Sequence, residues 1–101
     1  MAESKSFNNY VYPIHMKRPV GFDSYFEKWI SQWKPYLSEF VGIPNVIGIE
    51  IGALYGECSV FCAETIASGE NSLHIVIDIN TNEYLQNNIA PYKNIRFIHS
   101  N

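Results

Sequence analysis

The chain has 101 residues, of which 47% are hydrophobic and 17% are charged. This composition is typical of a folded globular protein, and the length allows a single domain. The formal net charge of −3 leaves no basic footprint, which argues against a free-standing nucleic-acid binder. No run reaches about eighteen apolar residues, and the polar first residues lack the apolar core of a secretory signal. We therefore expect an intracellular, cytoplasmic protein without a membrane span.

The first part of the chain predicts an arm followed by an aromatic-rich helical segment. Residues 1–21 show no regular periodicity, and we expect an irregular arm whose aromatic and apolar residues at 10–14 anchor it to the surface. The run Ser24–Glu27 has the spacing of a capping box, which predicts a helix starting there. Pro35 disfavours helical geometry at the preceding residue and suits the first turn of a second short helix that ends at Phe40.

A glycine-rich loop between a predicted strand and a predicted helix is the most informative feature. The apolar segment at 46–51 predicts a β-strand that carries an acid, Glu50, near its end. The chain then turns through Gly52 and Gly56 into a predicted helix at 57–67. Gly52 allows a sharp turn, and Gly56 allows a helix or a ligand to approach the strand closely. The first amides of such a helix face an anion or carboxylate, as in nucleotide-binding loops.

Two further strands complete the predicted sheet. The run at 73–79 is apolar on both faces, as in a buried parallel strand, and Asp78 lies at its carboxyl end. Gly69 is placed to end the preceding helix. A short helix at 82–89 leads to a third strand at 94–99. Because parallel crossovers are right-handed, we expect the spatial order three, two, one in an α/β fold.

This succession of motifs resembles the first two motifs of class I S-adenosylmethionine-dependent methyltransferases. The dinucleotide-binding fingerprint fits less well, since Leu54 occupies a position where that fingerprint has glycine. The resemblance covers about residues 22–101 and implies a partial Rossmann-like three-layer sandwich there, with three parallel strands, flanking helices and an N-terminal aromatic helical segment. The matching residues are Gly48, Glu50, Ile51, Gly52, Gly56, Ser59 and Asp78.

The resemblance implies that the chain binds S-adenosylmethionine through the glycine loop. Glu50 would orient the amino end of the methionine. The backbone of Gly52 and Ala53 would approach the cofactor, and Tyr55 and Gly56 would complete the loop. A plainer role for Glu50 stays open, namely a strand-end carboxylate that accepts hydrogen bonds from loop amides.

The nucleoside half of the cofactor would lie at the second strand. By the resemblance, Asp78 would accept both ribose hydroxyls, because a carboxylate has two acceptor oxygens. Ile79 would pack on one face of the adenine, and Asn101 would accept a hydrogen bond from the adenine amine. The alternative for Asp78 is that it caps the turn after it.

The cysteines and histidines suggest no metal site. Cys58 and Cys62 lie four residues apart on a predicted helix, where packing in the core is favoured over a metal or redox pair. A structural zinc site needs a second pair of ligands, and His74 and His99 have no evident partner. We therefore predict no metal, and the free thiols fit a reducing compartment.

The methyltransferase fold uses about seven strands, more than this sequence supplies. We therefore expect the cofactor-binding portion of a methyltransferase, truncated and inactive alone, with an unknown methyl acceptor. Two alternatives stay open: a non-catalytic remnant that serves as an interaction module, and the front half of another Rossmann-like nucleotide-binding enzyme. The strand at 46–51 should leave one sheet edge unpaired, so we expect self-association, cover by the arm, or pairing with a missing C-terminal half.

Overall fold

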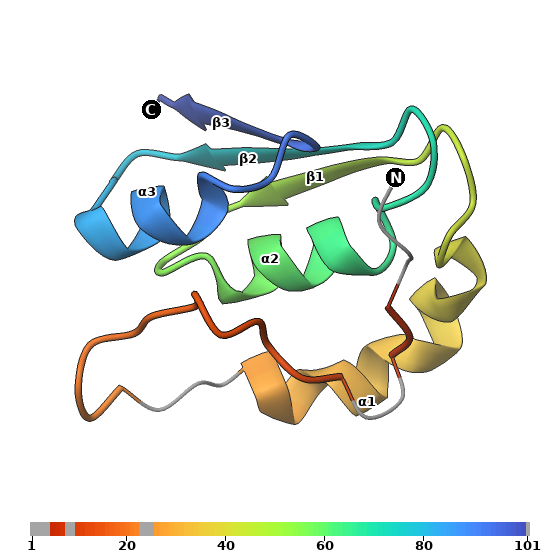
Figure 1. The fold of residues 1–101 in the computed structure, drawn as a ribbon, viewed down its shortest axis with the longest axis horizontal. Helices are drawn as coiled ribbons and strands as arrows, with labels where there is room; N and C mark the ends of the chain where they lie inside the picture. Colours follow the sequence, from red (N-terminus) through yellow and green to blue (C-terminus); the bar gives the residue numbers. More distant parts are fainter. Residues whose placement is uncertain (1–4, 8–9, 23–25, 101) are drawn as a thin grey trace.

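A computed structural model describes residues 5–7, 10–22 and 26–100. Figure 1 shows the sheet as one layer, with α2 and α3 beneath it and α1 with the N-terminal arm beneath α2. Within the described ranges, no helix has the length and apolarity needed to cross a membrane. The elements are, in chain order, α1 (Phe26–Leu37), the 3₁₀ helix η1 (Ser38–Phe40), β1 (Ile47–Ile51), α2 (Glu57–Glu64), β2 (Leu73–Asp78), α3 (Glu83–Ile89) and β3 (Ile95–His99).

The three strands form one parallel sheet in the order β1-β2-β3, which confirms the predicted α/β class, strand direction and order. The register places Ile49 opposite Ile75 and Ile75 opposite Arg96. Both crossovers step across the sheet in the same direction, so right-handedness puts α2 and α3 on the same face. The expected three-layer sandwich is therefore present only in part, because the described helices cover one face of the sheet and leave the other open (Figure 1).

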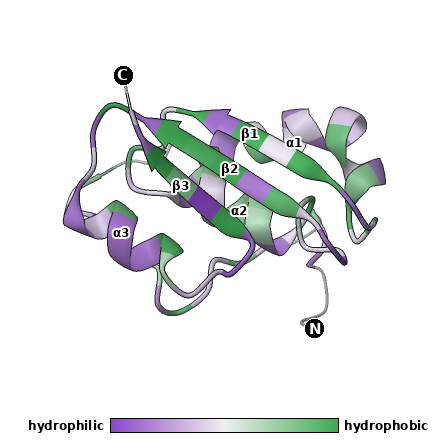
Figure 2. Cartoon of the chain, turned by 90° about the horizontal axis from the view of Figure 1, so that it is seen from above, coloured by the Kyte–Doolittle hydropathy of each residue, from purple (hydrophilic) through white to green (hydrophobic). Residues whose placement is uncertain are grey.

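The uncovered side of the sheet is here called the bare face, and hydrophobic residues occupy most of the three strands (Figure 2). Because side chains alternate along a strand, the register shows which residues of the three strands point to the bare face. On β1 the exposed fractions are 67% for Ile47, 65% for Ile49 and 83% for Ile51. Contiguous apolar surface of this kind marks an interaction site more often than a solvent-facing one. The bare face consists of one charged residue, Arg96, and the apolar residues Ile47, Ile49, Ile51, Leu73, Ile75, Ile77 and Ile98.

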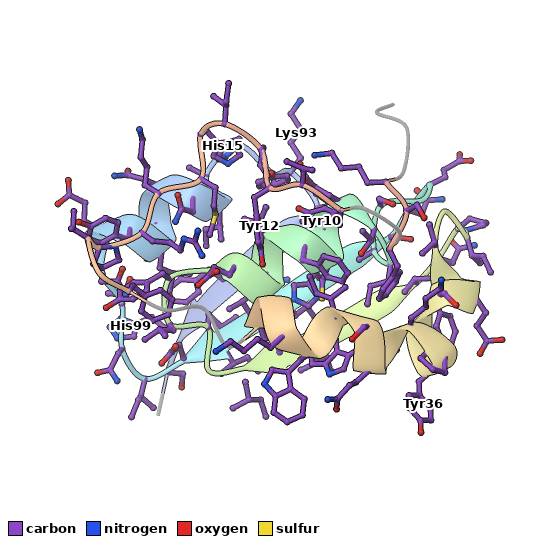
Figure 3. The ribbon with its side chains drawn as sticks, turned by 90° about the horizontal axis from the view of Figure 1, so that it is seen from below. Tyr10, Tyr12, His15, Tyr36, Lys93 and His99 are labelled. Atoms are coloured by element: carbon purple, nitrogen blue, oxygen red, sulfur yellow. The ribbon has the colours of Figure 1, made fainter. Side chains whose placement is uncertain are left out.

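Two apolar clusters lie on the covered side of the sheet. One joins the sheet and α3 through the buried residues Ala53, Val76, Leu85 and Ile89. The other, here called the α2 cluster, joins α2 to the arm and α1. Tyr10 and Tyr12 of the arm pack against it, whereas Val11 and Ile14 are exposed, so only part of the predicted anchor contacts the body (Figure 3). The buried members of the α2 cluster are Phe7, Phe61, Cys62 and Ile66.

The helix α1 continues through Pro35 to Leu37, so the predicted break at the proline is wrong. A proline inside a helix removes one backbone hydrogen bond and crowds the preceding turn. Trp33 and Leu37 are four residues apart on one side of α1, and both pack against the α2 cluster. This packing holds the last turn helical in spite of the proline. The predicted capping box depends on Ser24, which lies outside the described residues.

The helix α2 ends at Glu64 rather than at residue 67, and Gly69 does not end it. The side chain of Asn94 satisfies carbonyl groups at this end: its Nδ2 atom donates to the oxygens of Ala63 and Ala67, both at 2.8 Å. A helix whose last carbonyls have such partners needs no glycine cap. The predicted end was too late because the side chain that terminates the helix comes from the loop before β3.

Gly69 instead allows the loop before β1 to approach. A Cβ atom at this position would lie 2.3 Å from the carbonyl oxygen of Ile43. We expect Gly69→Ala to lower the free energy of unfolding by about 2–3 kcal/mol, because two backbone segments must separate. Urea denaturation measures this loss, and Glu70→Ala, at an exposed neighbour, serves as the control. A variant within about 0.5 kcal/mol of the wild type would contradict this role for Gly69.

Candidate functional site

The glycine loop lies at the carboxyl ends of β1 and β2. Gly52 has φ +84°, and no atom lies within 4 Å of where its Cβ would be, so the loop leaves open space there. Gly56 has φ +88° and precedes the first turn of α2. A Cβ on Gly56 would lie 3.2 Å from Leu85 Cδ1 and 3.3 Å from Ile89 Cγ2. Of the two predicted roles for Gly56, the structure therefore shows the close approach of a helix, α3.

Asp78 fastens this loop to β2. Its Oδ2 atom accepts a hydrogen bond from Ala53 N at 2.8 Å, and its Oδ1 atom accepts one from Asn80 N at 2.9 Å. Gly52 N donates to Ile77 O at 2.8 Å beside them. The amide of Ala53 first, and then that of Asn80, lowers the pKa of the Asp78 carboxyl because hydrogen bonds to a carboxylate favour its charged form. Asp78 thus caps the turn after it, as the alternative predicted, and also holds the loop.

Apolar side chains flank Asp78 at this edge of the sheet. Ile79 and Leu54 are both more than half exposed. The carbonyl oxygen of Ile79 lies 2.9 Å from His99 Nε2, which joins the ends of β2 and β3. Asn101 lies outside the described residues, so its predicted contact with adenine stays a prediction.

The first turn of α2 points its amides at the same edge. The first helical hydrogen bond runs from Val60 N to Gly56 O, so the amides at 57–59 have no partner within the helix. Arg18 of the arm brings a guanidinium to this end, with Nη1 3.0 Å from Glu57 Oε2. Arg18 is thus paired with the carboxylate of Glu57, and the amides of the helix terminus are what favour a ligand carboxylate here.

A buried amide that the sequence analysis missed ties the arm to the loop. Asn88 is fully buried on α3. Its Nδ2 atom donates to Lys17 O at 2.7 Å and to Tyr55 O at 2.9 Å, and its Oδ1 atom accepts from Lys17 N at 2.9 Å. The ring of Tyr55 also meets Phe22 and Tyr84 edge-on, at 4.8 and 5.6 Å. The sequence feature that could have revealed this contact is the position of Asn88, three residues after Leu85 on the apolar side of a predicted helix.

Glu50 lies apart from this loop. Its Oε1 atom accepts a hydrogen bond from Ser59 Oγ at 2.8 Å and lies 2.9 Å from His74 Nε2. None of the loop amides in the described part of the chain donates to it. A Cβ on Gly48 would lie 2.6 Å from His74 Nδ1, so this glycine makes room for the imidazole. In the sequence, the histidine inside an otherwise apolar strand indicated a buried polar network of this kind. The resemblance instead assigned Glu50 to the same cofactor as Asp78.

The two thiols lie side by side on α2. The Sγ atoms of Cys58 and Cys62 lie 3.9 Å apart, and both cysteines are free. The neighbouring thiol and burial raise the pKa of Cys58, so it is not a ready nucleophile. Among the described residues, no three His, Cys, Asp or Glu side chains are grouped to hold a metal ion.

The structure therefore brings together Gly52, Ala53, Asp78 and Ile79 from the predicted set, with the unpaired amides of α2 beside them. Such an edge suits a ligand that has vicinal hydroxyl groups and a carboxylate. Comparison of the chain with protein-family models, with curated proteins and with solved structures gives no match.

Proposed function

We propose that this chain is the S-adenosylmethionine-binding portion of a methyltransferase. The observation that carries the proposal is the hydrogen bond from Ala53 N to Asp78 Oδ2, at 2.8 Å. It places the acid of β2 beside the glycine loop of β1, at the edge where open parallel sheets bind their ligands and where an acid commonly takes ribose hydroxyls. The order of the motifs along the sequence supports an adenosyl group as the ligand.

Each part of this edge has a role in the proposed complex. Each oxygen of Asp78 has one amide donor and keeps an acceptor position for a ribose hydroxyl. The open space over Gly52 accommodates the middle of the cofactor, and the exposed side chain of Ile79 packs on the adenine. The amides at 57–59 receive the carboxylate of the methionine. Glu50 has no part in this arrangement.

The proposal is confined to cofactor binding. The sulfonium already activates the methyl group, so a methyltransferase mainly aligns a nucleophile with it. His99 lies at the end of β3, and its Nε2 atom is occupied by the carbonyl oxygen of Ile79 at 2.9 Å. The methyl acceptor and the residues that align it are therefore left out of the assignment.

We expect Asp78→Ala to weaken the binding of S-adenosylhomocysteine by at least about tenfold, because two charged acceptors are lost. Isothermal titration calorimetry measures this change. Asp78→Asn keeps one carbonyl oxygen, which can still accept the hydrogen bond from the amide of Ala53. This variant therefore tests the contact with the ribose while the loop stays anchored. Glu70→Ala removes an exposed acid in the loop before β2 and should bind like the wild type. Unchanged affinity in Asp78→Ala would remove Asp78 from the site, and a wild type that binds no S-adenosylhomocysteine at millimolar concentration would overturn the proposal.

The bare face favours a second candidate function, a module that binds another protein through the sheet. Three isoleucines of β1 are each at least 65% exposed on this face, and β1 has a free edge. This function does not require Asp78. Asp78→Ala would then leave association unchanged, which distinguishes the two candidates.

A further inference from the structure

A cavity of about 440 Å³ lies between α1, α2 and β1, on the covered side of the sheet. Its volume is in the range of small-molecule sites. Its walls are mostly apolar and include Trp33, Leu37 and Phe40 from the α1–η1 segment and Ile66 after α2. Glu50 also lines it and brings an acid to these walls. The glycine loop, Asp78 and Ile79 do not line this cavity, whereas Cys58, whose amide is among those assigned to the cofactor carboxylate, does.

Glu50 places a buried carboxylate in this cavity. Its side chain is 10% exposed. The Oε1 atom has two partners, the hydroxyl of Ser59 and the imidazole of His74. The Oε2 atom receives no hydrogen bond from a nitrogen or hydroxyl donor of the described residues, and the neighbouring thiol of Cys58 is only a weak donor. This oxygen is not among the buried atoms that lack a partner, so a donor on a ligand or a water molecule can reach it.

His74 is the ring partner of Glu50 in this cavity. It is 3% exposed, and its Nδ1 atom is buried without a hydrogen-bond partner among the described residues, facing Gly48. Its Nε2 atom lies 2.9 Å from Glu50 Oε1, the same oxygen that Ser59 contacts. No Lys or Arg side chain is among the described residues that line the cavity.

We infer that this cavity binds a small organic cation, a primary amine with an aromatic or aliphatic body. The ammonium group would donate a charge-assisted hydrogen bond to Glu50 Oε2. The rings of Trp33 and Phe40 line the same cavity and favour a cation over a neutral polar group. The apolar body would contact Leu37 and Ile66.

A matched pair of probes tests this inference on the unaltered protein. The probes are 2-phenylethylamine and 2-phenylethanol, which have the same body and differ in the charged group. Titration of each into ¹⁵N-labelled protein is followed through the amide shifts of residues 48, 62 and 66. We expect the amine to bind at least about tenfold more tightly than the alcohol, and the shifts to be confined to the cavity. Equal affinities, no shifts at millimolar probe, or shifts at the glycine loop instead would each overturn the inference.

Variants locate the charge that makes the difference. Glu50→Gln keeps the shape and one acceptor oxygen, and we expect it to abolish the preference for the amine. Glu70→Gln removes an exposed acid outside the cavity and should keep the preference. Leu37→Trp fills the cavity and should weaken both probes. A preference that persists in folded Glu50→Gln would contradict the inference, and the comparison of the two probes on the wild type decides it if that variant fails to fold.

Discussion

Replacement of Phe61 by alanine is expected to lower the free energy of unfolding by about 3–5 kcal/mol. The ring is fully buried in the α2 cluster. It meets the rings of Phe7 and Tyr10 edge-on, with centroids 4.9 and 4.8 Å away. Its loss would leave a cavity between α2 and the arm. Since the total stability of a domain is about 5–15 kcal/mol, the variant should be close to unfolded, as measured by urea denaturation.

Two further variants test whether packing is the cause. Tyr36 is 76% exposed and projects away from α1, so Tyr36→Ala should change the stability by less than about 0.5 kcal/mol (Figure 3). Phe61→Leu retains much of the buried volume and should lose clearly less than Phe61→Ala. If Phe61→Ala lost less than about 1 kcal/mol, the α2 cluster would not be the main core.

A free edge runs along β1, next to the bare face. Leu73 N donates to Val46 O at 2.9 Å and Gly52 N donates to Ile77 O at 2.8 Å, so the even-numbered residues of this segment pair with β2. By alternation, the N–H and C=O groups of the odd-numbered residues point to the free edge. The aromatic residues of the described arm pack on α2 instead. We expected self-association, cover by the arm, or pairing with a further segment at this edge. In the described residues, the arm does not cover it.

We expect Ile49→Lys to weaken self-association of the protein by at least about tenfold, because a lysine on the β1 part of the bare face would be buried in the interface without a partner. Sedimentation velocity over a range of concentrations measures this change. Ile49 is 65% exposed, so the folded monomer should tolerate the substitution. Ile14→Lys makes the same change at a residue that is 99% exposed on the arm, and it should associate like the wild type. A wild type that stays monomeric at every concentration would show that the bare face does not bind a second copy.

The sheet, and the meeting of the glycine loop with Asp78 at its carboxyl edge, could be predicted because the sequence patterns that indicate them lie within short segments. A continuous apolar run that ends in Asp78, and another that ends just before Gly52, indicate parallel strands without knowledge of any contact. Since carboxyl ends of adjacent parallel strands meet at one edge, the proximity of Ala53 and Asp78 follows from the strand order. The adenosyl ligand and the compartment remain predictions, because neither follows from the backbone geometry.

The errors share a cause, which is contact between residues distant in the sequence. Pro35 stays helical because of packing against α2, and Gly69 is needed because of a carbonyl group 26 residues earlier, at Ile43. The plainer role predicted for Glu50, as an acceptor for loop amides, is also wrong, because its Oε1 atom lies 2.9 Å from Nε2 of His74, 24 residues away. Local preference cannot register these partners, and tertiary packing outweighs it where the two disagree.

The clamp made by Asn88 links the arm and the glycine loop thermodynamically. One side chain holds Lys17 on one side and Tyr55 on the other, so release of either segment leaves buried polar groups unpaired in both. By reciprocity, a ligand that orders the loop must stabilise the attachment of the arm by the same free energy that the attached arm contributes to ligand binding. Cleavage by trypsin after Lys17 would then slow when the loop is occupied, although the ligand never touches that peptide bond.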